Sequence, residues 1–168
     1  MEKKLLYPYL TYCYLSIKNS LQSLLLRPSF LEDCEKWRTS VIQHNTLQDV
    51  YDGKIWSEFQ VYDGRPFLSN PLSFAFTINL DWFRPFKHSN FSIGAIYMTI
   101  MNLPRNLRNK PENILLVGIL PGPSEPSNIN GFLKPLVNKL NEFWVGKELE
   151  ICGCSSKNCE VRIVMRIM

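Results

Sequence analysis

At 168 residues the chain is long enough for one domain with a packed core and hardly long enough for two. Hydrophobic residues make up 45% of it, which excludes a disordered protein, and no apolar run approaches the roughly 20 residues that cross a bilayer. The net charge of +4 permits contact with nucleic acid but does not demand it. We therefore expect a soluble globular protein.

The region before about residue 62 predicts short helices. Four apolar residues recur there at helical spacing: Ile17, Leu21, Leu24 and Leu25. Residues 29–32 have the sequence of a capping box at the start of a second helix, and residues 55–59 indicate a third. The turn sequence at residues 63–66 then separates a helical segment, residues 1–62, from a second domain, residues 66–168.

The second domain changes to the period of a β-sheet. Apolar and polar residues alternate from Phe74 to Leu80, so this strand has one apolar face and ends at Asp81 on its polar face. Residues 93–103 predict a second strand. The unbroken apolar run at residues 114–120 predicts a third strand, covered on both faces.

A long amphipathic helix and a final strand follow. Apolar residues recur at helical spacing from Ile129 to Trp144, and Gly146 is suited to end the helix. Residues 161–167 predict the last strand, after a short edge strand at residues 149–151. Three antiparallel strands, a crossover helix and a parallel fourth strand form the opening order of an RNase H-like fold. We therefore expect an α/β protein, a partial RNase H-like mixed sheet preceded by the small helical segment.

Three of the five cysteines lie close together in a polar stretch near the C-terminus: Cys152, Cys154 and Cys159. A structural zinc ion requires four ligands and usually two residues between paired cysteines, and this spacing offers neither. Free thiols of an intracellular protein therefore explain the pattern better than a metal site does.

Asp81 is the first candidate for chemistry. A carboxylate at a strand end, beside polar Asn79, can be one ligand of a divalent metal ion, although phosphoryl transfer by two metals needs several carboxylates. On pattern alone, a single aspartate at a strand end is more often a turn or surface residue. His88 can approach Asp81 as a supporting partner or lie separately at the surface.

Three basic residues lie in the connection between the second and third predicted strands: Arg105, Arg108 and Lys110. One interpretation is a solvated loop, which is the ordinary place for such side chains. The other is a set of phosphate contacts with bound nucleic acid, because cationic side chains neutralise the backbone charge of DNA.

Several motifs are more specific together than any single residue. They are Asp81-Trp82-Phe83-Arg84-Pro85, Asn102-Leu103-Pro104-Arg105, the string from Glu112 to Pro126 and Phe132-Leu133-Lys134-Pro135, with Asp49-Val50-Tyr51-Asp52-Gly53 and Trp56-Ser57-Glu58-Phe59 ahead of them. These motifs resemble the transposases of CACTA-like DNA transposons. The likeness covers most of the chain.

The resemblance implies an RNase H-like nuclease in which a triad of acidic residues holds two divalent ions, Mg²⁺ or Mn²⁺. Asp81 matches the first acidic residue. The family's second aspartate follows the strand that begins here at Val161, in a Cys-Asp-x-Pro context, and this sequence ends at Met168 before it. We therefore expect a truncated transposase fragment that is catalytically inactive. By resemblance its partner is the DNA of transposon ends, and its place of action is the nucleus.

An unfinished sheet also offers an open edge through which the chain can self-associate. The alternative function is a domesticated module that keeps the fold for binding DNA or protein without catalysis. A reading frame that continues past Met168 into Cys-Asp-x-Pro favours the fragment, whereas an expressed stop without that remnant favours the module.

Overall fold

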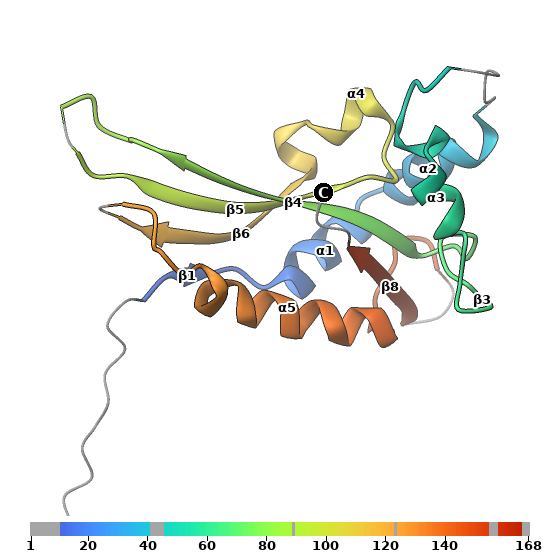
Figure 1. The fold of residues 1–168 in the computed structure, drawn as a ribbon. Coiled ribbons are helices and arrows are strands. Elements are labelled where there is room, and N and C mark those ends of the chain that lie inside the picture. The colour runs from blue at the N-terminus through green and yellow to red at the C-terminus, as the bar shows by residue number, and fades with distance from the viewer. Residues whose placement is uncertain (1–10, 41–45, 89, 123, 155–157, 166–168) are drawn as a thin grey trace, which may run out of the picture.

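The computed structural model describes residues 11–40, 46–88, 90–122, 124–154 and 158–165. Its centre is a curled six-stranded sheet with the strand order β1-β6-β5-β4-β8-β7 (Figure 1). The strands are β1 (Cys13–Tyr14), β4 (Ser73–Phe83), β5 (Ile93–Ile100), β6 (Ile114–Pro121), β7 (Lys147–Leu149) and β8 (Cys159–Met165). β8 runs parallel to β4 and the other pairings are antiparallel, so the sheet is mixed and the predicted α/β class is confirmed.

Five helices and a small hairpin surround the sheet in the described part of the chain. The helices are α1 (Ile17–Leu25), α2 (Phe30–Glu35), α3 (Lys54–Glu58), α4 (Arg105–Arg108) and α5 (Asn130–Val145), with 3-10 turns at Lys36–Thr39, Val50–Asp52 and Pro111–Asn113. The hairpin pairs β2 (Val61–Tyr62) with β3 (Arg65–Pro66) across the predicted turn. Within the described ranges, every helix lacks the length or apolar character that spanning a membrane requires.

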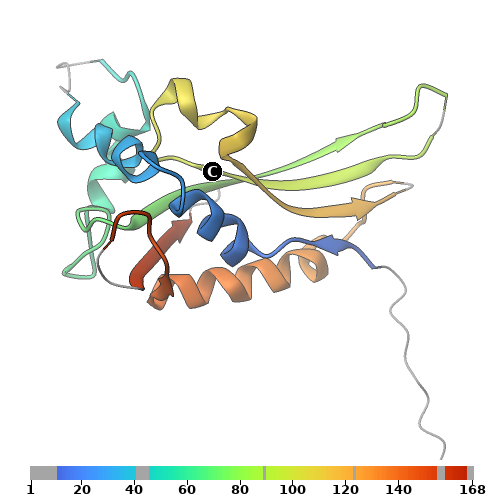
Figure 2. The ribbon, with the colours of Figure 1, turned by 180° about the vertical axis from the view of Figure 1, so that it is seen from behind.

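One face of the sheet packs against α1 and α5 (Figure 2). The core there joins Phe74 and Phe76 of β4 to Leu21 of α1 and to Leu140 and Phe143 of α5. All five side chains are buried, as the alternation in β4 and the helical spacing of α1 and α5 predict. Helix α1 belongs to the predicted helical segment, so that segment and the sheet share a single core cluster.

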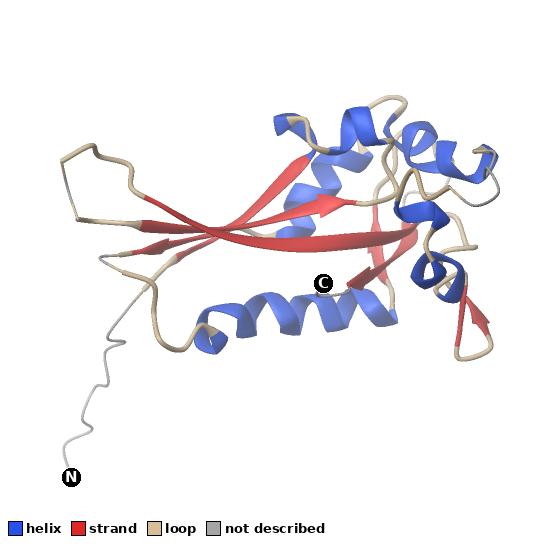
Figure 3. Cartoon of the chain, turned by 45° about the horizontal axis from the view of Figure 1, so that its top comes forward, coloured by secondary structure: helices blue, strands red, loops and turns tan. Residues whose placement is uncertain are grey.

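The opposite face of the sheet is covered only in part. Trp56, Phe67 and Leu68 pack against Val164 of β8 and close the end of the sheet where β4 begins. Figure 3 shows the short helices gathered at that end, while the hairpin of β4 and β5 extends away from them. The second half of β4 therefore has a covered face and an open face.

The predicted capping box at residues 29–32 is wrong. Ser29 has a left-handed backbone with φ of 61° and its side chain makes no capping hydrogen bond, so it cannot hold the first turn of α2 in the predicted way. A capping box occurs instead at the turn Val50–Asp52. The side chain of Asp49 accepts from the backbone N–H of Asp52, and the side chain of Asp52 accepts from the backbone N–H of Asp49.

The prediction that the third strand is covered on both faces is also wrong. In β6, Leu116 and Ile119 are each 37% exposed, whereas Leu115, Val117 and Leu120 are buried. The pairing of β5 with β6 shifts register between Ile96 and Tyr97, and this irregularity changes which side chains of β6 face outward.

Smaller differences concern the ends of elements. The second strand ends at Ile100 rather than at residue 103, because Asn102 turns inward. The edge strand before β8 spans Lys147–Leu149 instead of 149–151. The predicted last strand extends to residue 167, and its final two residues lie outside the described residues.

Candidate functional site

The open face of the sheet carries the polar residues of β4. By register, Thr77, Asn79 and Asp81 of β4 share this face with Tyr97 and Ala95 of β5. Leu116 and Ile119 of β6 continue it beyond β5. We call these seven residues the open face. Its mixture of a carboxylate, an amide, hydroxyls and exposed apolar groups distinguishes it from the apolar face beneath it.

Asp81 lies near the end of β4, exposed and paired with Ala95. On its other side, the described residues of β8 pair only with the first four residues of β4, from Ser73 with Arg162 to Phe76 with Met165. Among the described residues, Asp81 is therefore held in the sheet by β5 alone.

His88 is exposed in the connection from β4 to β5, seven residues after Asp81. Its partnership with Asp81 stays a prediction. The part of the chain described here contains no group of three His, Cys, Asp or Glu side chains placed to hold a metal ion. The role of Asp81 as a metal ligand therefore stays a prediction, and the described residues do not complete a metal centre around it.

The three basic residues predicted to contact phosphate have different surroundings. Arg105 and Lys110 are exposed at the two ends of the turn that contains α4. Arg108 between them is buried, with 7% of its surface exposed. The grouping of Arg108 with two surface cations is a correction to the sequence interpretation, because its guanidinium points into the protein.

Arg108 forms the centre of a buried polar cluster. Its Nη2 lies 2.7 Å from Oδ1 of Asp49, and the guanidinium also donates to the carbonyl oxygens of Leu103 at 3.2 Å and Met101 at 3.1 Å. The ring of Tyr51 lies 5.4 Å from the guanidinium carbon. These contacts fasten the segment around Asp49 to the connection between β5 and β6.

Tyr51 and Asn102 extend this cluster to β4. The hydroxyl of Tyr51 donates to the carbonyl oxygens of Asn102 and Leu103, and burial raises its pKa to about 12 although Arg108 acts in the opposite direction. The fully buried amide of Asn102 accepts from the backbone N–H of Ala75 at 2.8 Å and donates to the carbonyl of Ser73 at 3.1 Å. Asn102 thus supplies the hydrogen bonds that a neighbouring strand would otherwise give to the start of β4.

Comparison with known protein families shows which family this chain belongs to. Residues 44–166 match the model of the transposase family tnp2. The chain belongs to this transposase family. No curated protein and no solved structure matches it. The family match spans the turn at Asp49, the whole of β4 to β6, helix α5 and β8.

The structure separates the transposase-like motifs of this tnp2-family chain into two kinds. Asp49, Tyr51 and Asn102 belong to motifs that resemble transposases, yet their side chains are occupied in holding the fold together. Asp81 comes from the same resemblance and lies on the open face instead. The sequence interpretation missed the structural residues, although a polar residue just beyond a buried strand, such as Asn102 two residues after β5, is a signal that could have found one.

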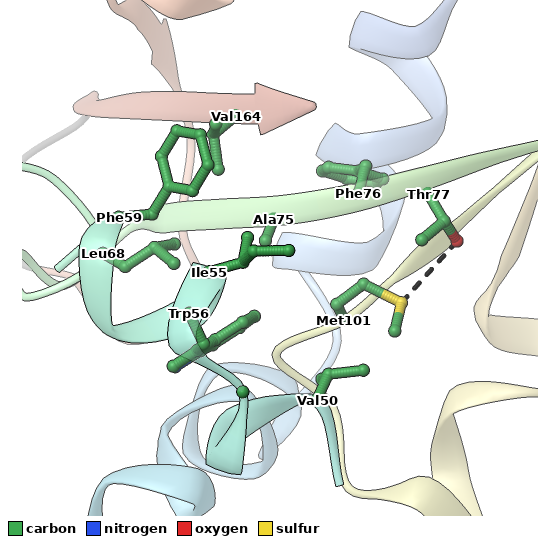
Figure 4. Close-up of a pocket in the computed structure, with 11 residues that line it drawn as sticks. Val50, Ile55, Trp56, Phe59, Leu68, Ala75, Phe76, Thr77, Met101 and Val164 are labelled. Atoms are coloured by element: carbon green, nitrogen blue, oxygen red, sulfur yellow. Dashed lines mark hydrogen bonds between the residues drawn. The ribbon is translucent and has the colours of Figure 1, made fainter. Parts of the chain in front are cut away.

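An apolar cavity of about 220 Å³ adjoins the open face at its covered end. Figure 4 shows Trp56 and Phe59 of the α3 region, Ala75 and Thr77 of β4, and Met101 around it. The hydroxyl of Thr77 donates to the sulfur of Met101 at 3.6 Å. In this tnp2-family chain the cavity has apolar walls and offers no acid, base or nucleophile for chemistry.

Proposed function

We propose that the chain forms part of the catalytic domain of a CACTA-like DNA transposase with an RNase H-like fold. Family membership supports the transposase origin. The observation that carries the proposal is the placement of β8, parallel to β4 and next to it, after a crossover through α5. This is the opening strand order of an RNase H-like sheet, and β4 is the strand that holds Asp81.

In this proposal Asp81 is the first metal-binding carboxylate of the transposase. Its exposed oxygens suit Mg²⁺ or Mn²⁺, which prefer oxygen ligands. In a complete site the ions would supply charge stabilisation during cleavage of the DNA backbone.

In this proposal the described residues would supply one ligand, Asp81, and they do not fit a complete two-metal site. One carboxylate does not hold two divalent ions close together against their mutual repulsion. We therefore expect no cleavage or joining of DNA by these 168 residues alone.

A test of Asp81 needs a signal that does not depend on activity. We expect Mn²⁺ to bind weakly, with a dissociation constant in the millimolar range. The paramagnetic ion should then broaden the NMR signals of Asp81 and of its pairing neighbour Ala95. Asp81→Asn should abolish the broadening at Ala95. Asp63→Asn, a change of an exposed aspartate in the turn between β2 and β3, should leave it intact. Broadening at Ala95 that survives Asp81→Asn would rule out Asp81 as the ligand.

The absence of cleavage is tested on labelled DNA with Mg²⁺ or Mn²⁺. The expected outcome is intact DNA for both the wild-type chain and Asp81→Asn. Metal-dependent nicking by the wild type that disappears in Asp81→Asn would contradict the proposed inactivity, because it would require an active site completed in another way.

We further propose that Arg105 and Lys110 contact DNA phosphates. Both are exposed and lie on the same connection, whereas the donors of Arg108 are used within the protein. Log affinity falls as log salt concentration rises, and each lost phosphate contact should make that slope shallower by about one. Arg105→Ala and Lys110→Ala should show this change, and Lys54→Ala, which removes a lysine whose side chain is 87% exposed, should not. Equal slopes for all three variants would refute this contact.

The edge of β4 on the side away from β5, beyond the described residues of β8, is the proposed site of self-association. From Thr77 to Phe83, β4 pairs with β5 on one side, and no described strand pairs with it on the other. An edge of this kind can pair with another chain. We expect light scattering to show concentration-dependent dimers, and Ile78→Pro, which removes a backbone N–H on the side of β4 away from β5, to reduce them. A monomer at all concentrations would exclude the interface.

A further inference from the structure

Two cysteines near β8 have their sulfur atoms in direct contact. The Sγ atoms of Cys154 and Cys159 are 2.9 Å apart. All five cysteines lie in described residues, and none of them forms a disulfide. We propose that Cys154 and Cys159 form a reversible redox pair, which an oxidised low-molecular-weight thiol such as glutathione disulfide converts to an intramolecular disulfide. This inference does not depend on nuclease activity.

A different backbone element positions each cysteine. Cys159 is the first residue of β8 and pairs with Leu149 of β7. Cys154 ends a tight turn in which its N–H donates to the carbonyl of Ile151 and Gly153 takes a left-handed φ of 75°. Because the turn and the strand are both fixed by hydrogen bonds, the sulfur contact follows from the fold.

Helix α1 fixes the loop that leads to these thiols. The side-chain amide of Gln22 donates to the carbonyl of Glu150 at 2.7 Å and accepts from its N–H at 3.0 Å. The N–H of Cys152 donates to the carbonyl of Leu25 at 3.1 Å. Cys152 is therefore held by its backbone in the same loop, while the sulfur contact of Cys159 is with Cys154.

The thiols are also accessible to an oxidant. Cys154 is exposed and Cys159 is partly exposed, whereas Cys34 is buried in the core. Exposed disulfides that form from neighbouring thiols tend to be labile and regulatory. The contact with Cys154 and, to a smaller extent, burial raise the pKa of the Cys159 thiol. Cys154, the more exposed sulfur, is then suited to react first.

The reaction balances as two thiol–disulfide exchanges. The Cys154 thiolate attacks one sulfur of glutathione disulfide, breaks its S–S bond and releases one glutathione thiolate. The Cys159 thiol then gives up its proton, and its sulfur attacks the Cys154 sulfur of the mixed disulfide and releases the second glutathione thiolate. The two cysteines lose two electrons, glutathione disulfide gains them, and the two released thiolates take up the protons.

The expected consequence is a tighter connection into β8. The bond would close the loop between Cys154 and Cys159 directly before the strand that pairs with β4. Closing a loop restricts the open states of the segment. Oxidation should therefore hold β8 against β4, the strand that carries Asp81.

Trypsin provides a direct test, because Lys157 lies between the two cysteines. After incubation with glutathione disulfide and alkylation, cleavage at Lys147, Lys157 and Arg162 should leave residues 148–157 and 158–162 joined until a reductant is added. Cys152→Ser is the matched control and should keep the joined peptides. Cys154→Ser and Cys159→Ser should lose them.

Two outcomes would overturn the inference. One is separate peptides from the wild type at every ratio of glutathione disulfide to glutathione. The other is loss of the joined peptides in Cys152→Ser, which would assign the bond to a different pair. Hydrogen exchange then tests the consequence: the amides of Glu160 and Val161 should exchange roughly tenfold more slowly after oxidation. Equal exchange rates in the two forms would show that the bond does not hold β8.

Discussion

The two halves of β4 belong to one strand and have opposite surroundings. From Ser73 to Phe76 the strand pairs with β8, receives the side chain of Asn102 on its other side and is buried or partly buried throughout. From Thr77 to Phe83 it pairs with β5 only, and one face is open. The first half is held by β8 and by Asn102. The second half is held by β5 and by the core on one face.

This difference indicates where function can reside on the strand. Substitutions in the first half disturb core packing or the buried polar cluster, so its polar neighbours are required for folding. Substitutions on the open face of the second half remove little packing. A polar residue there, such as Asp81, is free to serve binding or chemistry without serving stability. Four measurements test whether the two halves of β4 differ in this way.

The largest effect is expected from Arg108→Ala. The change removes a buried guanidinium and leaves the carboxylate of Asp49 and the carbonyl oxygens of Met101 and Leu103 without their partner. Breaking a buried ion pair from one side costs about 3–5 kcal/mol, so the free energy of unfolding in urea should fall by that amount. The exposed control on the same helix, Arg105→Ala, should change it by less than about 0.5 kcal/mol. Similar losses for the two variants would mean that the buried cluster does not brace β4.

Asn102→Ala should have the next largest effect. It leaves the N–H of Ala75 and the carbonyl of Ser73 without their hydrogen bonds in a buried position. Each unsatisfied buried group costs about 1–3 kcal/mol, and we expect a total loss of about 2–4 kcal/mol in urea denaturation. The matched control, Asn79→Ala, removes an amide from the open face and should cost under about 0.5 kcal/mol. An equal cost at Asn79 would erase the distinction between the halves.

Sequence patterns predicted the regular elements well, and the structure shows why. The alternation from Phe74 to Leu80 and the helical spacing from Ile129 to Trp144 reflect burial on one side, which is a local property. The boundaries were less accurate, since the inward turn of Asn102 ends β5 early. The exposure of Leu116 and Ile119 could not be read from an unbroken apolar run, because it depends on pairing with β5 and on what covers the sheet.

The candidate site was predictable in part. Resemblance singled out Asp81, and alternation placed it on the polar face of its strand. The same reasoning grouped Arg108 with surface cations, because a basic residue in a connection usually faces water. Its partner Asp49 lies far away in the sequence, and only the fold brings the two side chains to 2.7 Å. Long-range pairs of this kind are set by tertiary structure and leave no local pattern.

Alkaline pH should reveal a smaller effect at Tyr51. Burial raises its folded pKa to about 12 from an ordinary value of 10.0, so ionisation is easier in the unfolded chain. The stability that the neutral hydroxyl contributes is present in full below pH 10 and is lost as the pH rises toward 12. Tyr51→Phe should be less stable than the wild type by about 1 kcal/mol at pH 7, since it loses the hydrogen bonds to Asn102 and Leu103. That difference should shrink between pH 10 and pH 12 in urea denaturation, and a constant difference would contradict the assignment.

The smallest effect is expected from Asp81→Asn, at the position to which resemblance assigns the chemistry. Asp81 is exposed, its pairing neighbour is the small, uncharged Ala95, and asparagine preserves its size and shape. The free energy of unfolding should therefore change by less than about 0.5 kcal/mol. The loss expected for Arg108→Ala is several times greater. If Asp81→Asn instead cost more than about 1 kcal/mol in urea denaturation, Asp81 would be bound into the fold in the manner of Asp49. The carboxylate would then have a structural reason to be present, and the proposal that it serves metal binding would lose its main support. A neutral result together with the loss of Mn²⁺ broadening at Ala95 would separate stability from binding at this residue, as the contrast between the halves of β4 requires.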